Sequence, residues 1–225
     1  IGSRVLVRVF EHRIEIRDLA CQALLRSHPR AERPGTVVLP ADERVFNDPF
    51  FPRVYHGALV GFHDTDTQVV LVISEPGENA SRMIRYLGSG HVDGAIVASH
   101  HGPELARSLS QLSTPVVFIG DPETPGVPFV DLDQEGAAQR ATAHLISRGC
   151  RHIATIAGPA DMAASRRRLR GFTDALAAAA LSPAGVEEGD FSILSGLRAA
   201  ERLLAADDPF DGLVVASDLM AVGAL

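Results

Sequence analysis

The stretch HIATIAGPADMAASRRRLRGFTDALAAAAL, residues 152–181, decides the fold class. It begins with an apolar run of the kind that forms buried parallel strands. A Gly-Pro turn follows, and then a segment in which Phe172 and Leu176 stand four residues apart, as on one face of a helix. A strand that leads directly into a helix is the repeating unit of α/β folds.

The same alternation runs through most of the chain. Further apolar runs occupy residues 36–39, 69–74, 94–99, 115–120 and 212–217, and segments of crossover length separate them. The sequence therefore predicts an α/β fold of doubly wound parallel sheets. Ligands of such sheets bind beyond the carboxyl ends of the strands, so the residues that follow each strand are the candidates for a site.

Local signals mark several helix ends. Asp48 before Pro49 is typical of a helix start, and Gly149 is typical of a helix stop. Asp218 follows the last apolar run and is expected to cap the helix after it.

Residues 1–35 fit the alternation poorly. RVLVRVF (4–10) is compatible with a strand, EIRDLACQALLRS (15–27) with a short helix, and SHPRAERPG (27–35) with a linker.

Composition excludes several function classes. The net charge of −7 argues against nonspecific binding to nucleic acid or to an anionic membrane. All 21 basic residues are Arg, and without Lys there is no phosphate-binding P-loop, pyridoxal Schiff base or protein-kinase site. No nucleophile or dinucleotide motif is present either, so we predict no enzyme activity and no cofactor.

The remaining chemistry-bearing residues indicate a cytoplasmic protein without a metal. Cys21 and Cys150 are isolated, which favours a reducing compartment. His100 and His101 have no further ligand at metal-binding spacing, so no metal is predicted. No apolar run reaches about 18 residues, so we predict no membrane contact.

Six motifs in order give a specific resemblance. They are NDPFF (47–51), HVDGAIVAS (91–99), GVPFVDLDQEGAAQRATAHLISRGCRHIATIAGP (126–159), RLRGFTDAL (168–176), EGDFSILSG (188–196) and VVASDLMAVGAL (214–225). From about residue 36 to 225 the chain resembles the effector-binding part of LacI-type bacterial transcription repressors.

The resemblance implies two subdomains of periplasmic-binding-protein type. A small effector, a sugar or a nucleobase-like compound, would bind in a cleft between them, and the protein would be a homodimer. Residues 1–35 would be an N-terminal extension, 36–150 the first subdomain, and 151–225 an incomplete second subdomain. The helix-turn-helix head of the family is not recognisable in residues 1–35, so operator DNA is expected to bind only through such a head.

The implied mechanism is a population shift, in which the effector favours one subdomain closure and so changes how the dimer presents its DNA-binding heads. A periplasmic-type sugar-binding protein without DNA binding is the alternative. A small-molecule enzyme on a flavodoxin-like sheet is a third hypothesis.

The resemblance also assigns a role to one of the four arginines at 166, 167, 168 and 170. In the family, the Arg before Leu-x-Gly-Phe enters the cleft, and this residue is Arg168 here. A planar guanidinium suits bidentate bonds to hydroxyl groups or to a carboxylate. The alternatives are a solvated basic face and a nucleic-acid patch.

Six further residues are candidates for ligand contacts, and four of them also have a structural alternative. Phe50 and Phe51 would stack on a ligand ring or pack in the core, and we expect one of each. Phe191 would form a pocket wall or pack in the core. Asp131 would accept two hydroxyl donors or act as a turn or cap carboxylate. Ser217 would donate to the ligand, and His100 would lie at the edge of the cleft.

Overall fold

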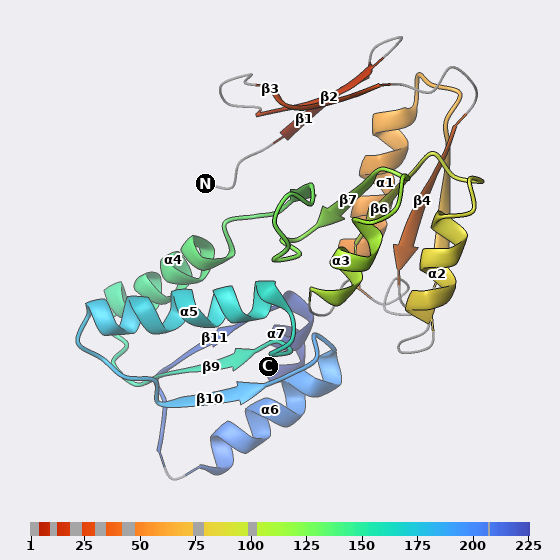
Figure 1. Ribbon diagram of the computed structural model, residues 1–225. Helices are drawn as coiled ribbons and strands as arrows, with labels where there is room; N and C mark the ends of the chain where they lie inside the picture. The colour runs from red at the N-terminus through yellow and green to blue at the C-terminus, as the bar shows by residue number, and fades with distance from the viewer. Residues whose placement is uncertain are drawn as a thin grey trace. The chain divides into compact units, whose positions relative to one another are not determined.

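The computed structural model describes residues 5–9, 13–18, 24–29, 35–41, 48–73, 79–98, 103–206 and 208–225. These residues fall into two compact units, 2–132 and 133–225, called here the first and second unit. Both units contain a parallel sheet with helices on its two faces, which confirms the predicted fold class (Figure 1).

The first unit contains a five-stranded parallel sheet in the order β5-β4-β6-β7-β8. This order, in which the second strand of the sheet along the chain, β5, lies at the edge, is one of the two common doubly wound topologies. Its elements are β4 (Thr36–Ala41), α1 (Phe50–Phe62), β5 (Gln68–Ile73), α2 (Asn79–Leu87), β6 (Gly94–Val97), α3 (Glu104–Leu109), β7 (Val116–Ile119) and β8 (Phe129–Val130).

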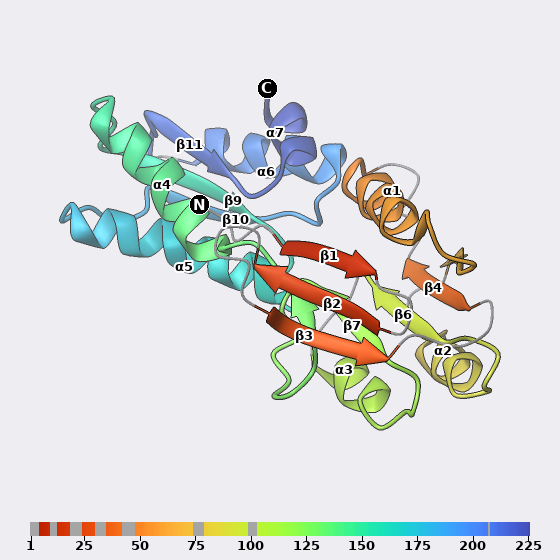
Figure 2. The ribbon, with the colours of Figure 1, turned by 90° about the horizontal axis from the view of Figure 1, so that it is seen from above.

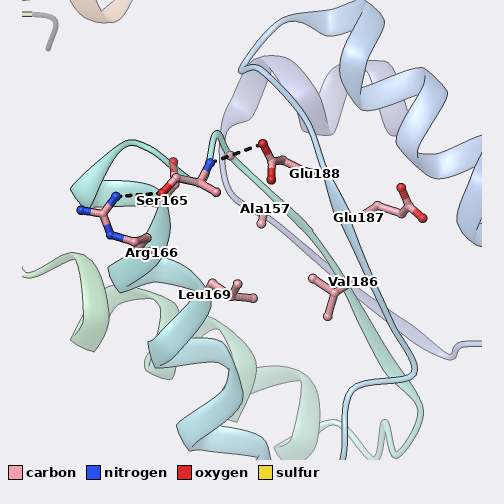
Figure 3. A pocket seen from close by; sticks show the side chains of 9 residues that line it. Ala157, Ser165, Arg166, Leu169, Val186, Glu187 and Glu188 are labelled. Carbon is pink, nitrogen blue, oxygen red and sulfur yellow. Dashed lines mark hydrogen bonds between the residues drawn. The ribbon is translucent and has the colours of Figure 1, made fainter. Parts of the chain in front are cut away.

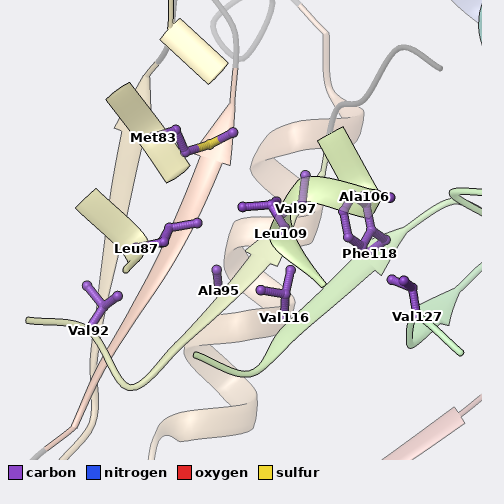
Figure 4. Packing of buried hydrophobic residues seen from close by; sticks show 10 residues of the cluster. All are labelled: Met83, Leu87, Val92, Ala95, Val97, Ala106, Leu109, Val116, Phe118 and Val127. Carbon is purple, nitrogen blue, oxygen red and sulfur yellow. The ribbon is translucent and has the colours of Figure 1, made fainter. Parts of the chain in front are cut away.

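The side chains of this sheet alternate between two cores, as the two-residue period of strands requires. Ala95 and Val97 of β6 face α2 and α3, together with Phe118 of β7, in the larger cluster shown in Figure 4. Ile96 packs on the opposite face, against the cluster that includes Phe51 of α1.

The N-terminal segment of the first unit is a separate antiparallel sheet, β1 (Val5–Val9), β2 (Arg13–Asp18) and β3 (Leu24–Pro29), visible in Figure 2. The predicted strand over residues 4–10 is confirmed by β1. The predicted helix over residues 15–27 is wrong in its described part, because 15–18 belong to β2 and 24–27 to β3. Ile14 and Ile16 alternate with charged residues, which is the period of a strand.

The second unit contains a three-stranded parallel sheet in the order β10-β9-β11. Its elements are α4 (Gln134–Ser147), β9 (Ile153–Ala157), α5 (Ala163–Ala178), β10 (Gly185–Glu188), α6 (Ile193–Ala205), β11 (Gly212–Val215) and α7 (Asp218–Ala224). All five residues of the central strand β9 are buried. Helices α4 and α5 cover one face of the sheet, and α6 and α7 cover the other (Figure 1).

The boundary between the units lies between Leu132 and Asp133, earlier than the predicted boundary at residue 150. The physical reason is the close packing of α4 on α5, since a Cβ built on Gly171 of α5 would overlap the carbonyl oxygen of Glu135 in α4. Helix α4 therefore belongs to the second unit. It stops where predicted, because Gly149 takes a φ of 101°, a left-handed conformation that favours glycine.

Candidate functional site

Arg168 joins three elements at the carboxyl ends of the strands of the second unit. Its Nε donates a hydrogen bond to Oε1 of Gln134 at 2.7 Å, and its Nη1 donates to the carbonyl oxygen of Ala216 at 2.5 Å. The guanidinium carbon lies 5.9 Å from the centre of the Phe191 ring, within cation–π range. One side chain from α5 thus connects the start of α4, the end of β11 and the turn after β10.

Phe191 lies in a strained turn. Its φ is 71°, a conformation that a non-glycine residue adopts rarely and at a cost of about 1–3 kcal/mol. The preceding Asp190 fixes this turn, because its Oδ1 accepts the N–H of Ser192 at 2.9 Å and its own N–H donates to Oγ of Ser195 at 3.0 Å. The hydrogen bond from the Ser192 side chain is the main cause that lowers the pKa of Asp190, while partial burial opposes it.

The Phe191 ring packs directly on Gly158, at the end of β9. A Cβ on Gly158 would overlap the edge of the ring and would lie 2.6 Å from Oγ of Ser165. The glycine after β9 therefore makes room for the aromatic ring beside the guanidinium. The arrangement combines a fixed positive charge and an aromatic face, two features that together can bind the hydroxyl groups and the apolar face of a sugar ring.

Ser217 follows β11 and acts as the N-cap of α7. Its Oγ accepts the N–H of Met220 at 3.3 Å. The prediction that Asp218 caps this helix is wrong, because Asp218 is the first helical residue. The cap lies one position earlier, where the backbone is extended and the hydroxyl reaches the N–H three residues on.

Arg166 and Arg170, the arginines near Arg168, form contacts with different groups from those that Arg168 contacts. Arg166 Nη1 donates to the carbonyl oxygen of Ala160 at 2.8 Å, and Arg170 lies 3.9 Å from the carboxylate of Glu135 on the exposed surface. Arg168 is therefore directed at the strand ends, and Arg170 belongs to a solvated face. The expected contact of Arg168 with an effector stays a prediction.

Phe50 and Phe51 of the first unit separate as expected. Both residues belong to the first turn of α1. Phe51 is 5% exposed and packs in the core between α1 and the sheet, whereas Phe50 is 45% exposed. Their rings meet edge to face with centroids 5.4 Å apart. Asp48 holds the start of α1 by accepting the N–H of Phe50 at 2.9 Å. Only Phe50 of this pair presents an aromatic surface for a ligand.

Asp131 lies at the end of β8, and its carboxylate accepts backbone N–H groups. Oδ1 accepts from Leu132 at 2.7 Å and Oδ2 from Asp121 at 3.1 Å. These bonds are those of the structural alternative, a turn carboxylate, and contact with an effector stays a prediction. His100 lies outside the described residues.

Sequence reasoning missed two side chains of the second unit. Gln134 is 8% exposed and holds Arg168, and Ser165 is 2% exposed under Gly158. Neither residue belongs to a recognisable chemical pattern. The sequence offered one signal for Gln134, namely its position directly after Asp133 at the expected start of a helix. In the structure Asp133 caps this helix by accepting the N–H of Gly136 at 2.8 Å.

The described ranges contain neither a metal-binding cluster nor a membrane-spanning helix. No group of three or more His, Cys, Asp or Glu residues lies in an arrangement suited to a metal ion in the described part of the chain. Within the same ranges, no helix has the length and apolar character needed to span a membrane.

Comparison with known proteins gives one consistent result. The family described as periplasmic binding proteins and sugar binding domain of LacI family matches residues 34–225. The HTH-type transcriptional regulator CelR of Thermobifida fusca is 36% identical over 204 residues, 87% of this chain and 59% of CelR. The HTH-type transcriptional repressor PurR of Aliivibrio fischeri is 31% identical over 186 residues, 79% of this chain and 55% of PurR.

A solved structure extends the match to three dimensions. The complex of the transcriptional regulator CelR with cellobiose superimposes with a TM-score of 0.77 at 36% identity, over 85% of this chain and 63% of that one. These proteins regulate transcription, which agrees with the prediction that the chain is not an enzyme. The chain spans less than two thirds of the length of each.

Proposed function

Because the chain belongs to the family of periplasmic binding proteins and LacI sugar-binding domains, we propose that it binds the small-molecule effector of a transcription regulator. The observation that carries this proposal is the cluster of Arg168, Phe191 and Gln134 at the carboxyl ends of β9, β10 and β11. Ligands of open α/β sheets bind at these strand ends.

The effector is a sugar. Arg168 offers charged N–H donors to hydroxyl groups, and the Phe191 face suits the C–H side of a pyranose ring. The similarity to CelR, which has been solved with cellobiose, supports the same ligand class. Nucleobase-like compounds remain the second ligand class in the test below, since an aromatic face also stacks on a base.

Effector binding acts on transcription through a difference in affinity. An effector shifts an equilibrium between two conformations only by as much as it binds one of them better. In the full-length regulator, effector binding changes the affinity for operator DNA by a certain factor. Binding of operator DNA changes the affinity for the effector by the same factor. The regulator acts in the cytoplasm, where its DNA is.

Operator DNA is contacted by a part of the longer protein outside the described residues. The described stretches of the N-terminal segment, 5–9, 13–18 and 24–29, are strands and contain no recognition helix. Curated relatives that match this chain are named as HTH-type regulators and are longer than it. This similarity favours a regulator over the alternative, a periplasmic-type sugar-binding protein without DNA binding.

The full-length regulator is a homodimer in this proposal. Stable dimers cover apolar surface with the same patch of a second copy. Helices α6 and α7 of the second unit expose Ile193, Leu194, Leu197 and Val222. These helices pack closely, since a Cβ on Gly223 would lie 2.9 Å from the backbone nitrogen of Leu197.

Sedimentation velocity of the full-length protein tests the dimer. Leu194→Glu is expected to shift the protein toward the monomer. Leu204→Glu, at the other end of the same helix, is the matched control and is expected to leave the dimer intact. A wild-type protein that sediments as a monomer at micromolar concentration would refute the proposal.

A thermal-shift panel of this chain tests the ligand class. The panel contains neutral mono- and disaccharides, nucleobases and nucleosides. A ligand at about 100 times its dissociation constant stabilises the folded state by about 2.7 kcal/mol, which raises Tm by roughly 5–10 °C for a chain of this size. A shift with sugars alone supports the proposal, and a shift with nucleobases alone overturns the sugar assignment.

A further inference from the structure

A cavity of the second unit lies near the Arg168–Phe191 cluster. It has a volume of about 210 Å³ and lies between the start of α5 and the edge strand β10 (Figure 3). Apolar Ala157, Leu169 and Val186 form its floor, and Ser165, Arg166 and Glu188 supply polar atoms to its lining.

Ser165 is the unusual member of this lining. It is 2% exposed, and its Oγ has no hydrogen-bond partner among the described residues. Buried polar groups are nearly always paired, and an unpaired one calls for an explanation such as a bound ligand or water. Ser165 lines the cavity, and its hydroxyl lies buried behind that wall beside Gly158, so a rotation of the side chain would be needed for it to pair with a ligand atom in the cavity.

The start of α5 gives a second, independent observation. Its N-cap residue, Met162, makes no side-chain cap, as at α1 and α3 of the first unit, whereas Asp133, Ser192 and Ser217 cap α4, α6 and α7. The first N–H groups of a helix have no partner within the helix and need one outside it. A ligand oxygen in the cavity would meet both this helix end and, once its side chain has rotated, the Ser165 hydroxyl.

The charges around the cavity decide the chemical class of the ligand. Arg166 is held by the carbonyl oxygen of Ala160, and Glu188 accepts the N–H of the same residue at 3.3 Å. A sugar hydroxyl both donates and accepts, so it can pair with the carboxylate, the serine and the helix end. Glu187 is paired with Arg202, but a phosphate only accepts hydrogen bonds and could offer no proton to the carboxylate of Glu188. The lining therefore fits a neutral polyhydroxyl compound.

The size and position of the cavity decide how much of the ligand it takes. Pockets for drug-sized ligands measure about 300–1,000 Å³, so 210 Å³ suits one ring of a larger molecule. Gly158 contacts both Ser165 and the Phe191 ring, and Leu169 of the lining follows Arg168 in the chain. The cavity and the Arg168–Phe191 cluster are thus neighbours.

We propose that this cavity is a second sugar subsite, so that the effector is a disaccharide with one ring at Arg168 and Phe191 and the other beside Ser165 and Glu188. This inference rests on the proposed function, that the chain binds a sugar effector. To the proposed function it adds that the sugar has two rings, and it names the side chains that bind each ring.

Calorimetric titration of this chain with cellobiose, maltose and lactose, and with glucose and galactose, tests the subsite. At least one disaccharide is expected to bind at least tenfold more tightly than the monosaccharides from which it is made. Ser165→Ala removes one neutral hydrogen bond and is expected to weaken that disaccharide about threefold to tenfold. Glu188→Gln keeps the shape, removes the charge, and is expected to weaken it about tenfold or more. Both variants are expected to leave monosaccharide affinity within about twofold.

The control variant is Glu201→Gln, on the exposed surface of α6, which is expected to bind every sugar as the wild type does. The subsite is wrong if monosaccharides bind as tightly as disaccharides, if Ser165→Ala and Glu188→Gln weaken both equally, or if a sugar phosphate binds more tightly than its parent sugar. These outcomes leave the proposed function standing. If no sugar binds the wild type at all, the proposed function itself fails and the subsite fails with it.

Discussion

Substitution of Gly171 by Ala is expected to destabilise the second unit, although Ala is the better helix former. Gly171 lies inside α5 and faces α4. The added Cβ would overlap the carbonyl oxygen of Glu135 and would lie 2.9 Å from its carbonyl carbon and 3.1 Å from Cβ of Ala138. Ordinary contact begins near 3.4 Å, so the carbon pair alone requires the helices to separate by 3.4 − 2.9 = 0.5 Å.

The magnitude follows from two opposing effects. Ala in place of Gly in a helix interior stabilises the helix by about 1 kcal/mol. Overpacking a core costs about 1–3 kcal/mol, and the upper value applies here because the atoms of Glu135 belong to the backbone and cannot rotate away. The net loss is about 2 kcal/mol, which corresponds to a fall in Tm of roughly 4–8 °C.

Gly57→Ala is the matched control. Gly57 lies in the middle of α1 of the first unit, and no atom lies within 4 Å of a Cβ built there. The same substitution is expected to raise Tm by roughly 2–4 °C, because only the helix-propensity effect remains. Circular dichroism melts of the two variants measure both shifts. A Gly171→Ala variant that melts at or above the wild type would refute the assignment of α4 to the second unit.

Three further predictions concern single side chains. The pKa of Asp211 is lowered because its carboxylate accepts backbone N–H groups, first that of Arg151, so this stability is present above about pH 4 and is lost as the pH falls through the folded-state pKa. Asp211→Asn should therefore lower Tm at pH 7, and its Tm should approach that of the wild type as the pH falls through the folded-state pKa. A difference in Tm that is independent of pH would contradict this. Ser217→Ala should lower the free energy of unfolding by about 1 kcal/mol through loss of a helix cap, whereas Ser217→Gly should lower it by only a few tenths in urea melts. Gly158→Ala should displace the Phe191 ring and weaken sugar binding about tenfold in calorimetry, because the ring can swing away from the new methyl group only by leaving the site. Unchanged affinity in this variant would remove Phe191 from the site.

The parallel strands were predictable where they are apolar. β9 is buried along its whole length, and its sequence is an uninterrupted apolar and β-branched run. β10, by contrast, lies at the edge of the sheet and reads Gly-Val-Glu-Glu, which has no apolar run to detect. β8 contributes only two residues to its sheet. β10 escaped detection because it lacks an apolar run, whereas the edge strands β5 and β11 were predictable from theirs.

The N-terminal segment shows how a helical pattern can mislead. Leu19, Ala20 and Leu24 suggest a helix, whereas the alternation of Ile14 and Ile16 with charged residues suggests a strand. The pairing of β2 with strands on both sides decides between them. Such pairing depends on residues distant in the sequence, which a local pattern cannot include.

The site was predictable only in part, for a similar reason. Arg168 was predictable from its place before Leu-x-Gly-Phe, through the resemblance to the family. Gln134 and Ser165 were not identified, because their roles depend on the approach of α4 to α5 and on the fit of Phe191 over Gly158. The carboxylate of Asp131 was ambiguous, and its two backbone hydrogen bonds are those of a turn.

The most direct test of the central claim is a calorimetric titration of Arg168→Gln with the sugar that gives the largest thermal shift on the wild type. Arg170→Gln, two residues along the same helix and on the exposed surface, is the matched control. Loss of charged hydrogen bonds worth about 1.5–3 kcal/mol predicts affinity weaker by roughly tenfold to a hundredfold in Arg168→Gln, with Arg170→Gln unchanged. Wild-type affinity in Arg168→Gln, with the variant folded, would contradict the account, because the effector would then bind without the residue around which the proposed site is built.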